Sequence, residues 1–131
     1  MSMPTTILIY GRDTGLLQTR RLLLEASGYR VLMATELAEV KRVVGAEGID
    51  LLILCHSLST AETQEALAVV AAHTHKVHTL IMAAYWGSYS AGVPDLVLEA
   101  MEGPAHLVSA VERLVEHPAR ARAHPQNVQP L

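Results

Sequence analysis

Short apolar runs recur along the chain, and they constrain its fold more than any other feature. Three strong runs cover Thr5–Tyr10, Tyr29–Ala34 and Ile49–Cys55, a fourth covers Thr79–Ala84, and a weaker fifth covers Asp95–Glu99. The first run is β-branched and has no alternation of polar and apolar residues, which is typical of a strand covered on both faces. We therefore expect a sheet that is buried between two layers.

Helical patterns fill the first intervals between these runs. Asp13 and Thr14 can cap a helix that has leucines at helical spacing and ends near Gly28. Thr35 is expected to cap a second helix, which covers Glu36–Ala46 and carries its valines on one face. Each strand is therefore followed by an amphipathic helix.

Two later helices have start signals of their own. Ser59 and Glu62 have the spacing of a capping box, which predicts a helix that runs to about His73. Gly103 and Pro104 open the last helix, with the proline at its favoured first position. Strands and helices that alternate at such short spacing favour a parallel sheet with helices on both faces.

These elements predict an α/β fold: a flavodoxin-like, doubly wound, five-stranded parallel sheet with strand order 2-1-3-4-5. The most apolar run, Ile49–Cys55, is expected at its centre. The functional crevice of such a sheet lies beyond the carboxyl ends of strands 1 and 3. We assign residues 1–117 to one domain and interpret 118–131, which has three prolines and no apolar periodicity, as a disordered tail or linker stub.

Composition excludes several classes of protein. The net charge of −3 gives no electrostatic footprint for nucleic acid, and no apolar run approaches the roughly 20 residues of a membrane helix. The single cysteine, Cys55, excludes an internal disulfide, and the amino terminus lacks the pattern of a secretory signal. We expect a cytoplasmic protein that binds neither membrane nor nucleic acid by itself.

The apolar rhythm and the element spacing resemble the receiver domain of bacterial response regulators, the CheY-like family. The best matches are Gly28–Val31, which reads Gly-Tyr-Arg-Val, and Ile49–Leu54, which reads Ile-Asp-Leu-Leu-Ile-Leu. The likeness covers about residues 5–117. It implies a phosphorylation site built from an acidic pair after strand 1, an aspartate after strand 3, a hydroxyl residue after strand 4 and a lysine after strand 5.

The chain departs from the family at each of these positions. Gly11 and Arg12 replace the acidic pair, Cys55 occupies the phosphoacceptor position, Ala83 replaces the hydroxyl residue, and Glu99 replaces the lysine. Magnesium prefers hard oxygen ligands, which neither Gly11 nor Arg12 supplies. We therefore expect no phosphoacceptor, no metal, no cofactor and no enzymatic activity.

The segment after the fourth strand is also shorter than the family pattern. Residues 85–91 include Gly87, Ser88 and Ser90 and are too few for a full helix, so the fourth helix of the family is expected to be shortened or lost. Tyr85, Trp86 and Tyr89 hold three of the five aromatic side chains. They are expected either to cover the sheet edge or to form an interaction surface.

Three minor signals have structural alternatives. Cys55 and His56 could form a reactive thiol pair, but neighbours on a strand point to opposite faces, so a structural cysteine is favoured. Arg12 is a possible contact for an anion at the start of the first helix. Arg20 and Arg21 lie among polar neighbours and are expected on a solvated helix face.

The sequence favours a phosphorylation-independent pseudo-receiver, a protein–protein interaction module of bacterial signal transduction. Its expected partner is another protein or a second copy of the chain. The alternative is a small ligand-binding or thiol-based domain that uses the crevice formed by Gly11, Arg12 and Cys55.

Overall fold

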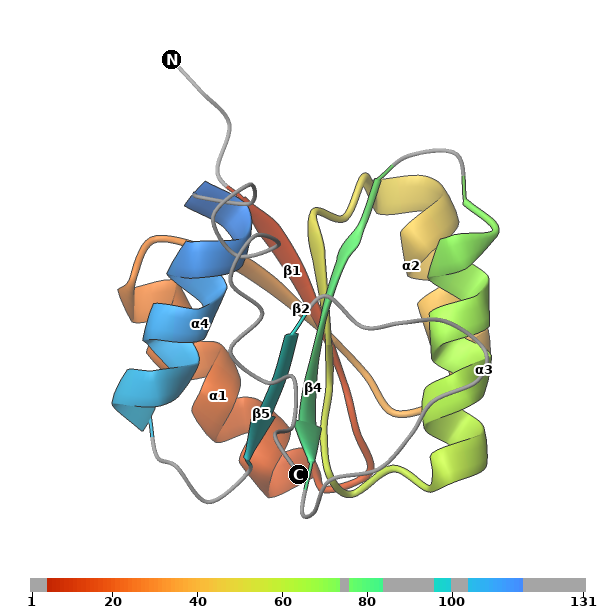
Figure 1. Ribbon diagram of the computed structural model, residues 1–131, viewed down its shortest axis with the longest axis horizontal. Coiled ribbons are helices and arrows are strands. Elements are labelled where there is room, and N and C mark those ends of the chain that lie inside the picture. Colours follow the sequence, from red (N-terminus) through yellow and green to blue (C-terminus); the bar gives the residue numbers. More distant parts are fainter. Residues whose placement is uncertain (1–4, 74–75, 84–95, 100–103, 117–131) are drawn as a thin grey trace, which may run out of the picture.

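Five parallel strands form a single sheet in the order β2-β1-β3-β4-β5 (Figure 1). The computed structural model describes residues 5–73, 76–83, 96–99 and 104–116. The elements are β1 Thr6–Tyr10, α1 Thr14–Ala26, β2 Arg30–Ala34, α2 Leu37–Glu47, β3 Leu51–Leu54, α3 Thr60–Ala71, β4 His78–Ala83, β5 Leu96–Glu99 and α4 Pro104–Glu116. The expected strand order and the central place of the third strand are confirmed.

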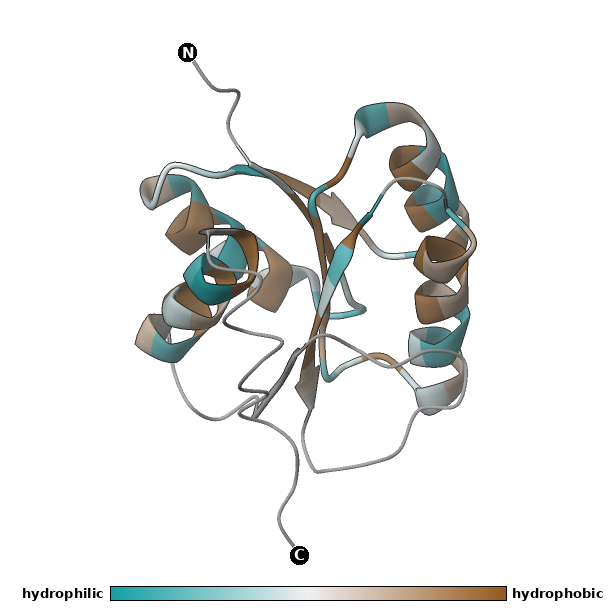
Figure 2. Cartoon of the chain, turned by 45° about the horizontal axis from the view of Figure 1, so that its top comes forward, coloured by the Kyte–Doolittle hydropathy of each residue, from teal (hydrophilic) through white to brown (hydrophobic). Residues whose placement is uncertain are grey.

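Helices cover both faces of this sheet. Figure 1 shows α1 and α4 on one side and α2 and α3 on the other. All five residues of β1 and all four of β3 are buried, because these two central strands have helices on both faces. In Figure 2 the apolar residues concentrate on the strands and on the helix sides that face them. The flavodoxin-like architecture follows from these two buried layers.

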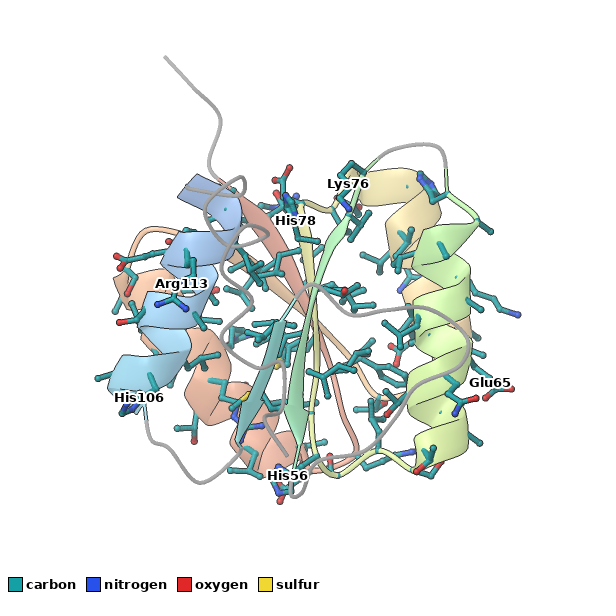
Figure 3. The ribbon with its side chains drawn as sticks, viewed as in Figure 1. His56, Glu65, Lys76, His78, His106 and Arg113 are labelled. Atoms are coloured by element: carbon teal, nitrogen blue, oxygen red, sulfur yellow. The ribbon has the colours of Figure 1, made fainter. Side chains whose placement is uncertain are left out.

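Strand register brings the carboxyl ends of the strands to one edge. Tyr10 of β1 pairs with Ala34 of β2 and with Leu54 of β3, and Ala83 of β4 pairs with Glu99 of β5. Figure 3 shows His56 at this edge and His78 at the opposite one. The loops after β1 and β3 therefore meet where the crevice of a doubly wound fold lies.

Most of the expected helix signals are confirmed. The Asp13 carboxylate accepts from Leu16 N–H at the start of α1, and the full capping box of Ser59 and Glu62 begins α3. The expected cap of α2 is wrong, because Glu36 holds the cap position without a side-chain bond. Thr35 stands one residue earlier, where its N–H and hydroxyl both donate to Oε1 of Glu39.

Two expectations fall on residues that the structure does not describe. The shortened fourth helix, with Tyr85, Trp86 and Tyr89, lies within 84–95, and the tail lies within 117–131. The helix labelled α4, Pro104–Glu116, is the last of the described helices and is not this segment. No helix among the described residues is long and apolar enough to cross a membrane.

Candidate functional site

The loops that follow β1 and β3 are bonded together at the carboxyl edge of the sheet. Cys55 N–H donates to the Tyr10 carbonyl at 3.0 Å, and Arg12 N–H donates to Oγ of Ser57 at 2.9 Å. The first bond continues the parallel pairing of β1 and β3 by one residue, and the second joins the two loops through the Ser57 side chain. The residues that the sequence assigned to the crevice, Gly11, Arg12 and Cys55, are brought to one place.

Gly11 allows the two loops to approach closely. A Cβ added at Gly11 would lie 2.9 Å from Cβ of Cys55, 3.1 Å from Oγ of Ser57 and 3.3 Å from Sγ of Cys55. The first distance is shorter than a real contact between two such carbons, so any larger residue would force the loops apart. The crevice floor is therefore closed by Gly11 against Cys55.

Arg12 crosses the mouth of the crevice. Its Nε donates to Oε2 of Glu62 at 2.7 Å, and its Nη2 donates to the same oxygen. The bond from Arg12, together with the N–H of Ser59, lowers the pKa of the Glu62 carboxyl. Arg12 thus links the β1 loop to the start of α3, while its expected contact with an anion stays a prediction.

Arg20 is the residue at this site that the sequence interpretation misplaced. The expected solvated face is wrong for Arg20, which is only 8% exposed, whereas Arg21 is partly exposed. The reason is helical spacing, because Arg20 lies three residues after Leu17 and four before Leu24, and all three face the sheet. The helical spacing predicts that Arg20 is buried, whereas the charge of its side chain predicts that it is exposed.

Cys55 is a buried thiol whose pKa is influenced by the charge of Arg20. Cys55 is 3% exposed and belongs to the same apolar cluster as Leu17 and Leu24. Burial raises the pKa of the Cys55 thiol, while the charge of Arg20 and a hydrogen bond from it act in the opposite direction. Burial is the largest of these influences, so the Cys55 thiol ionises less readily than a free cysteine.

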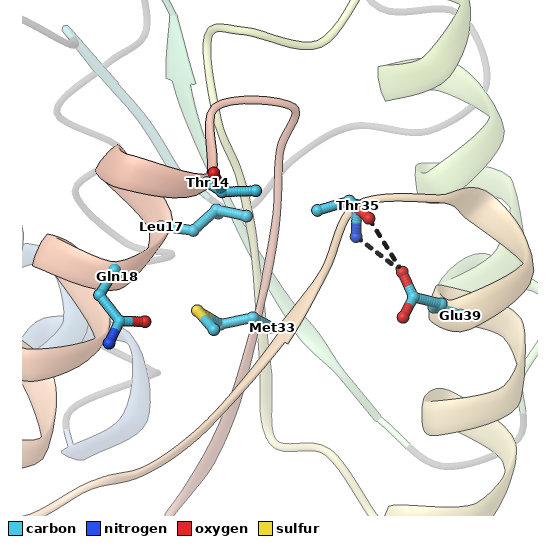
Figure 4. Close-up of a pocket in the computed structure, with 6 residues that line it drawn as sticks. All are labelled: Thr14, Leu17, Gln18, Met33, Thr35 and Glu39. Carbon is cyan, nitrogen blue, oxygen red and sulfur yellow. Dashed lines mark hydrogen bonds between the residues drawn. The ribbon is translucent and has the colours of Figure 1, made fainter.

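A small pocket lies beside the crevice, between α1 and β2 (Figure 4). Its volume is about 260 Å³, and it is lined by Thr14, Leu17, Gln18, Met33, Thr35 and Glu39. The backbone bond from Thr35, assisted by its hydroxyl, lowers the pKa of Glu39 and fixes that carboxylate at the pocket wall. Ligand sites usually exceed about 300 Å³, so this pocket is too small for a nucleotide-sized cofactor.

The solved structures most useful for comparison are receiver domains. The chain is similar to a CheY-like response-regulator receiver domain from Methanospirillum hungatei JF-1, at 22% identity and a TM-score of 0.75, over 90% of this chain and 98% of that one. It is also similar to the signal receiver domain of an HD domain-containing protein from Pseudomonas fluorescens Pf-5, at 16% identity and a TM-score of 0.78, over 90% and 99%.

A third similar structure is the receiver domain of a sensor histidine kinase from Pseudomonas aeruginosa PAO1, described with a magnesium ion coordinated in its active-site cleft. It is 16% identical, with a TM-score of 0.76, over 87% of this chain and 99% of that one. Neither a family model nor a curated protein matches the sequence. These likenesses show that the chain has the fold of CheY-like receiver domains.

The residues at the crevice of this chain do not fit a magnesium ion. Gly11 has no side-chain oxygen, Arg12 presents a guanidinium that is bonded to Glu62, and Cys55 offers a buried thiol. A cation and a thiol thus stand where a divalent cation would need carboxylates. Within the described residues, no group of three His, Cys, Asp or Glu side chains could hold a metal ion.

Proposed function

We propose that this chain is a pseudo-receiver, a signal-transduction module that acts by protein contact and does not use phosphoryl transfer from a donor. The receiver fold supplies the signalling context, since the similar structures are receiver domains of response regulators and of a sensor kinase. The proposed partner is another protein or a second copy of the chain, in the cytoplasm. No enzymatic activity is part of this proposal.

One observation carries the proposal: the crevice presents the Arg12 guanidinium and the buried Cys55 thiol at the positions where a receiver needs carboxylates. Phosphoryl transfer to a receiver needs a divalent cation to neutralise the charge of the incoming phosphoryl oxygens. The cation of Arg12 at a metal-binding position repels that metal, and a buried thiol is a poor phosphoacceptor. Arg12 therefore opposes binding of the metal, and Cys55 opposes transfer of the phosphoryl group.

The bonds between the two crevice loops also support a function in protein binding rather than in phosphoryl transfer. The loops after β1 and β3 are already joined by the Arg12–Ser57 bond and by the Arg12–Glu62 ion pair. These two interactions hold the loops together at the crevice. A surface fixed in this way suits a constitutive docking module better than a switch that waits for a metal and a phosphoryl group.

The central test is exposure of the folded chain to acetyl phosphate with magnesium, followed by intact-protein mass spectrometry. We expect no phosphoprotein from the wild type or from Cys55→Ser, while a metal-binding receiver domain in the same buffer is modified. Magnesium titration by calorimetry is expected to give no heat of specific binding. A stoichiometric phosphoprotein from the wild type would overturn the proposal.

Whether the partner is a second copy of the chain or a different protein requires a separate measurement. Size-exclusion chromatography with light scattering, over a wide range of protein concentration, distinguishes a second copy from a different protein as the partner. A mass of two chains identifies the self-association form. A mass of one chain at every concentration assigns the contact to another protein.

A further inference from the structure

The pocket between α1 and β2 is a cavity that the proposed function does not use. Three of its lining residues come from α1, and the others come from β2 and from the segment that follows it (Figure 4). Its volume of about 260 Å³ corresponds to roughly eight water molecules, at about 30 Å³ each in the liquid. A ligand of about six to eight non-hydrogen atoms has a similar size.

The pocket lining combines apolar side chains with one formal charge. Leu17 is buried and Met33 is half-buried, and Figure 4 shows both between Gln18 on one side and Glu39 on the other. Glu39 is the charged residue among the six that line the pocket. A ligand that uses both features needs an apolar part and a group that is complementary to a carboxylate.

The Glu39 carboxylate is held in place by its neighbour. Its Oε1 accepts from the Thr35 N–H at 2.9 Å and from the Thr35 hydroxyl at 3.2 Å. Both bonds use the same oxygen, and Figure 4 shows the second oxygen turned away from Thr35. The backbone bond from Thr35 lowers the pKa of Glu39, so the group is an anion at neutral pH. A fixed anion of this kind is preorganised for a cation.

The charges around the pocket also favour a cation. Asp13 and Glu36 hold the N-cap positions of α1 and α2, the two helices that supply lining residues. Each helix N-terminus carries about half a positive charge, which the full negative charge of the neighbouring carboxylate exceeds. Arg42 acts on Glu39 through its charge but does not line the pocket. An anionic ligand would therefore meet an excess of negative charge.

We propose that this pocket binds a small primary ammonium compound, whose cationic head bonds to Glu39 and whose short aliphatic chain lies on Leu17 and Met33. An alkylamine has a pKa close to that of lysine, about 10.4, so it is a cation at neutral pH. The hydroxyl of Thr14 and the amide carbonyl of Gln18, both on exposed lining residues, are further acceptors for its N–H groups. The inference does not rest on the proposed function, because it concerns a different site.

The test is a titration of the folded chain with n-pentylammonium chloride, followed by two-dimensional ¹H–¹⁵N NMR. We expect saturating shifts concentrated on the amides of the lining residues, with a Kd of about 1 mM for a ligand of this size. n-Pentanol has the same chain without the charge and should bind about tenfold more weakly. Pentanoate, which is an anion, should leave these amides unshifted.

Three variants localise the binding. Glu39→Gln keeps an acceptor for both Thr35 bonds but removes the charge, so it should raise the Kd about tenfold. Glu65→Gln is the matched control, because it makes the same charge change on an exposed side chain of α3 outside the pocket (Figure 3), and it should leave the Kd unchanged. Gln18→Phe fills the pocket from an exposed position and should abolish the saturating shifts.

Three results would overturn the inference. The first is a wild type whose shifts grow linearly without saturation or spread over the acidic surface. The second is an equal Kd for the wild type and a folded Glu39→Gln. The third is equal binding of n-pentylammonium and n-pentanol by the wild type, a comparison that requires no variant to fold. The acetyl phosphate experiment probes the crevice instead of this pocket, so each proposal can fail without the other.

Discussion

The two faces of the sheet differ in the polarity of the side chains that are buried against them. The face under α2 and α3 has a buried cluster of apolar side chains that includes Leu8, Leu52 and Leu54. The face under α1 and α4 has a similar cluster, but Cys55 belongs to it and the charged Arg20 is inserted beside it. The first face is an apolar core. The second face contributes less apolar burial, because it also contains the thiol of Cys55 and the side chain of Arg20.

Truncation on the apolar face should have the largest effect. Leu52 is fully buried at the centre of the sheet, so Leu52→Ala removes apolar contacts and leaves a cavity. We expect the free energy of unfolding to fall by about 3 kcal/mol, measured by urea titration. Cys55→Ala, on the other face, should lower the free energy of unfolding by clearly less. Equal losses in the two variants would show that the two faces contribute equally to stability.

Added volume at the crevice should have the next largest effect. Gly11→Ala places its Cβ 2.9 Å from Cβ of Cys55, so the loops must separate, and we expect a loss of about 2 kcal/mol. Adding Cys55→Gly removes the opposing carbon and should recover part of that loss in a double-mutant cycle. Strictly additive losses in chemical denaturation would show that the two positions do not share space.

Removal of the buried charge should change stability in the opposite direction. Arg20→Leu keeps an apolar stem between Leu17 and Leu24 and removes a guanidinium whose Nη1 is unpartnered among the described residues. We expect the free energy of unfolding to rise by about 1 kcal/mol, while Arg21→Leu changes it by less than about 0.5 kcal/mol. A large loss in Arg20→Leu would instead make Arg20 a stabilising residue, and the two faces would then be equivalent.

The ion pair at the crevice mouth should give the smallest effect, visible as a pH dependence. The pKa of Glu62 is lowered in the folded state, so its contribution is complete above the ordinary pKa of a glutamate. That contribution is lost as the pH falls through the lowered pKa. The stability difference between wild type and Glu62→Gln, followed by thermal unfolding, should therefore be greatest at neutral pH and shrink in acid. A difference that stays constant with pH would assign the effect to the helix cap alone.

The sequence determined the architecture because its signals were local and repeated. The uninterrupted apolar runs marked buried strands, and the capping box of Ser59 and Glu62 marked a helix start that the structure contains. Register followed from the same pattern, since parallel strands joined by short helical crossovers allow few arrangements. Thr35 was misjudged because a threonine before a helix can bond its backbone in more than one way.

The sequence predicted which residues lie at the site but not which side chains contact one another there. Sequence position placed Gly11, Arg12 and Cys55 together, because each follows a strand whose neighbours were already known. The ion pair of Arg12 with Glu62 and the burial of Arg20 both depend on contacts between segments that are distant in the sequence. No local pattern encodes such contacts. An arginine at an inward helical spacing is the one signal that would have identified Arg20.

The close contact of Gly11 with Cys55 also limits how this chain could be converted into a working receiver. A carboxylate introduced at position 55 alone would find no second carboxylate at position 11 or 12, so it would not recruit a metal. A carboxylate at position 11 has no room until Cys55 moves. Every single exchange toward a metal site therefore begins with a penalty, and a useful gain requires several simultaneous changes. No single substitution is therefore expected to turn this crevice into the metal site of a working receiver domain.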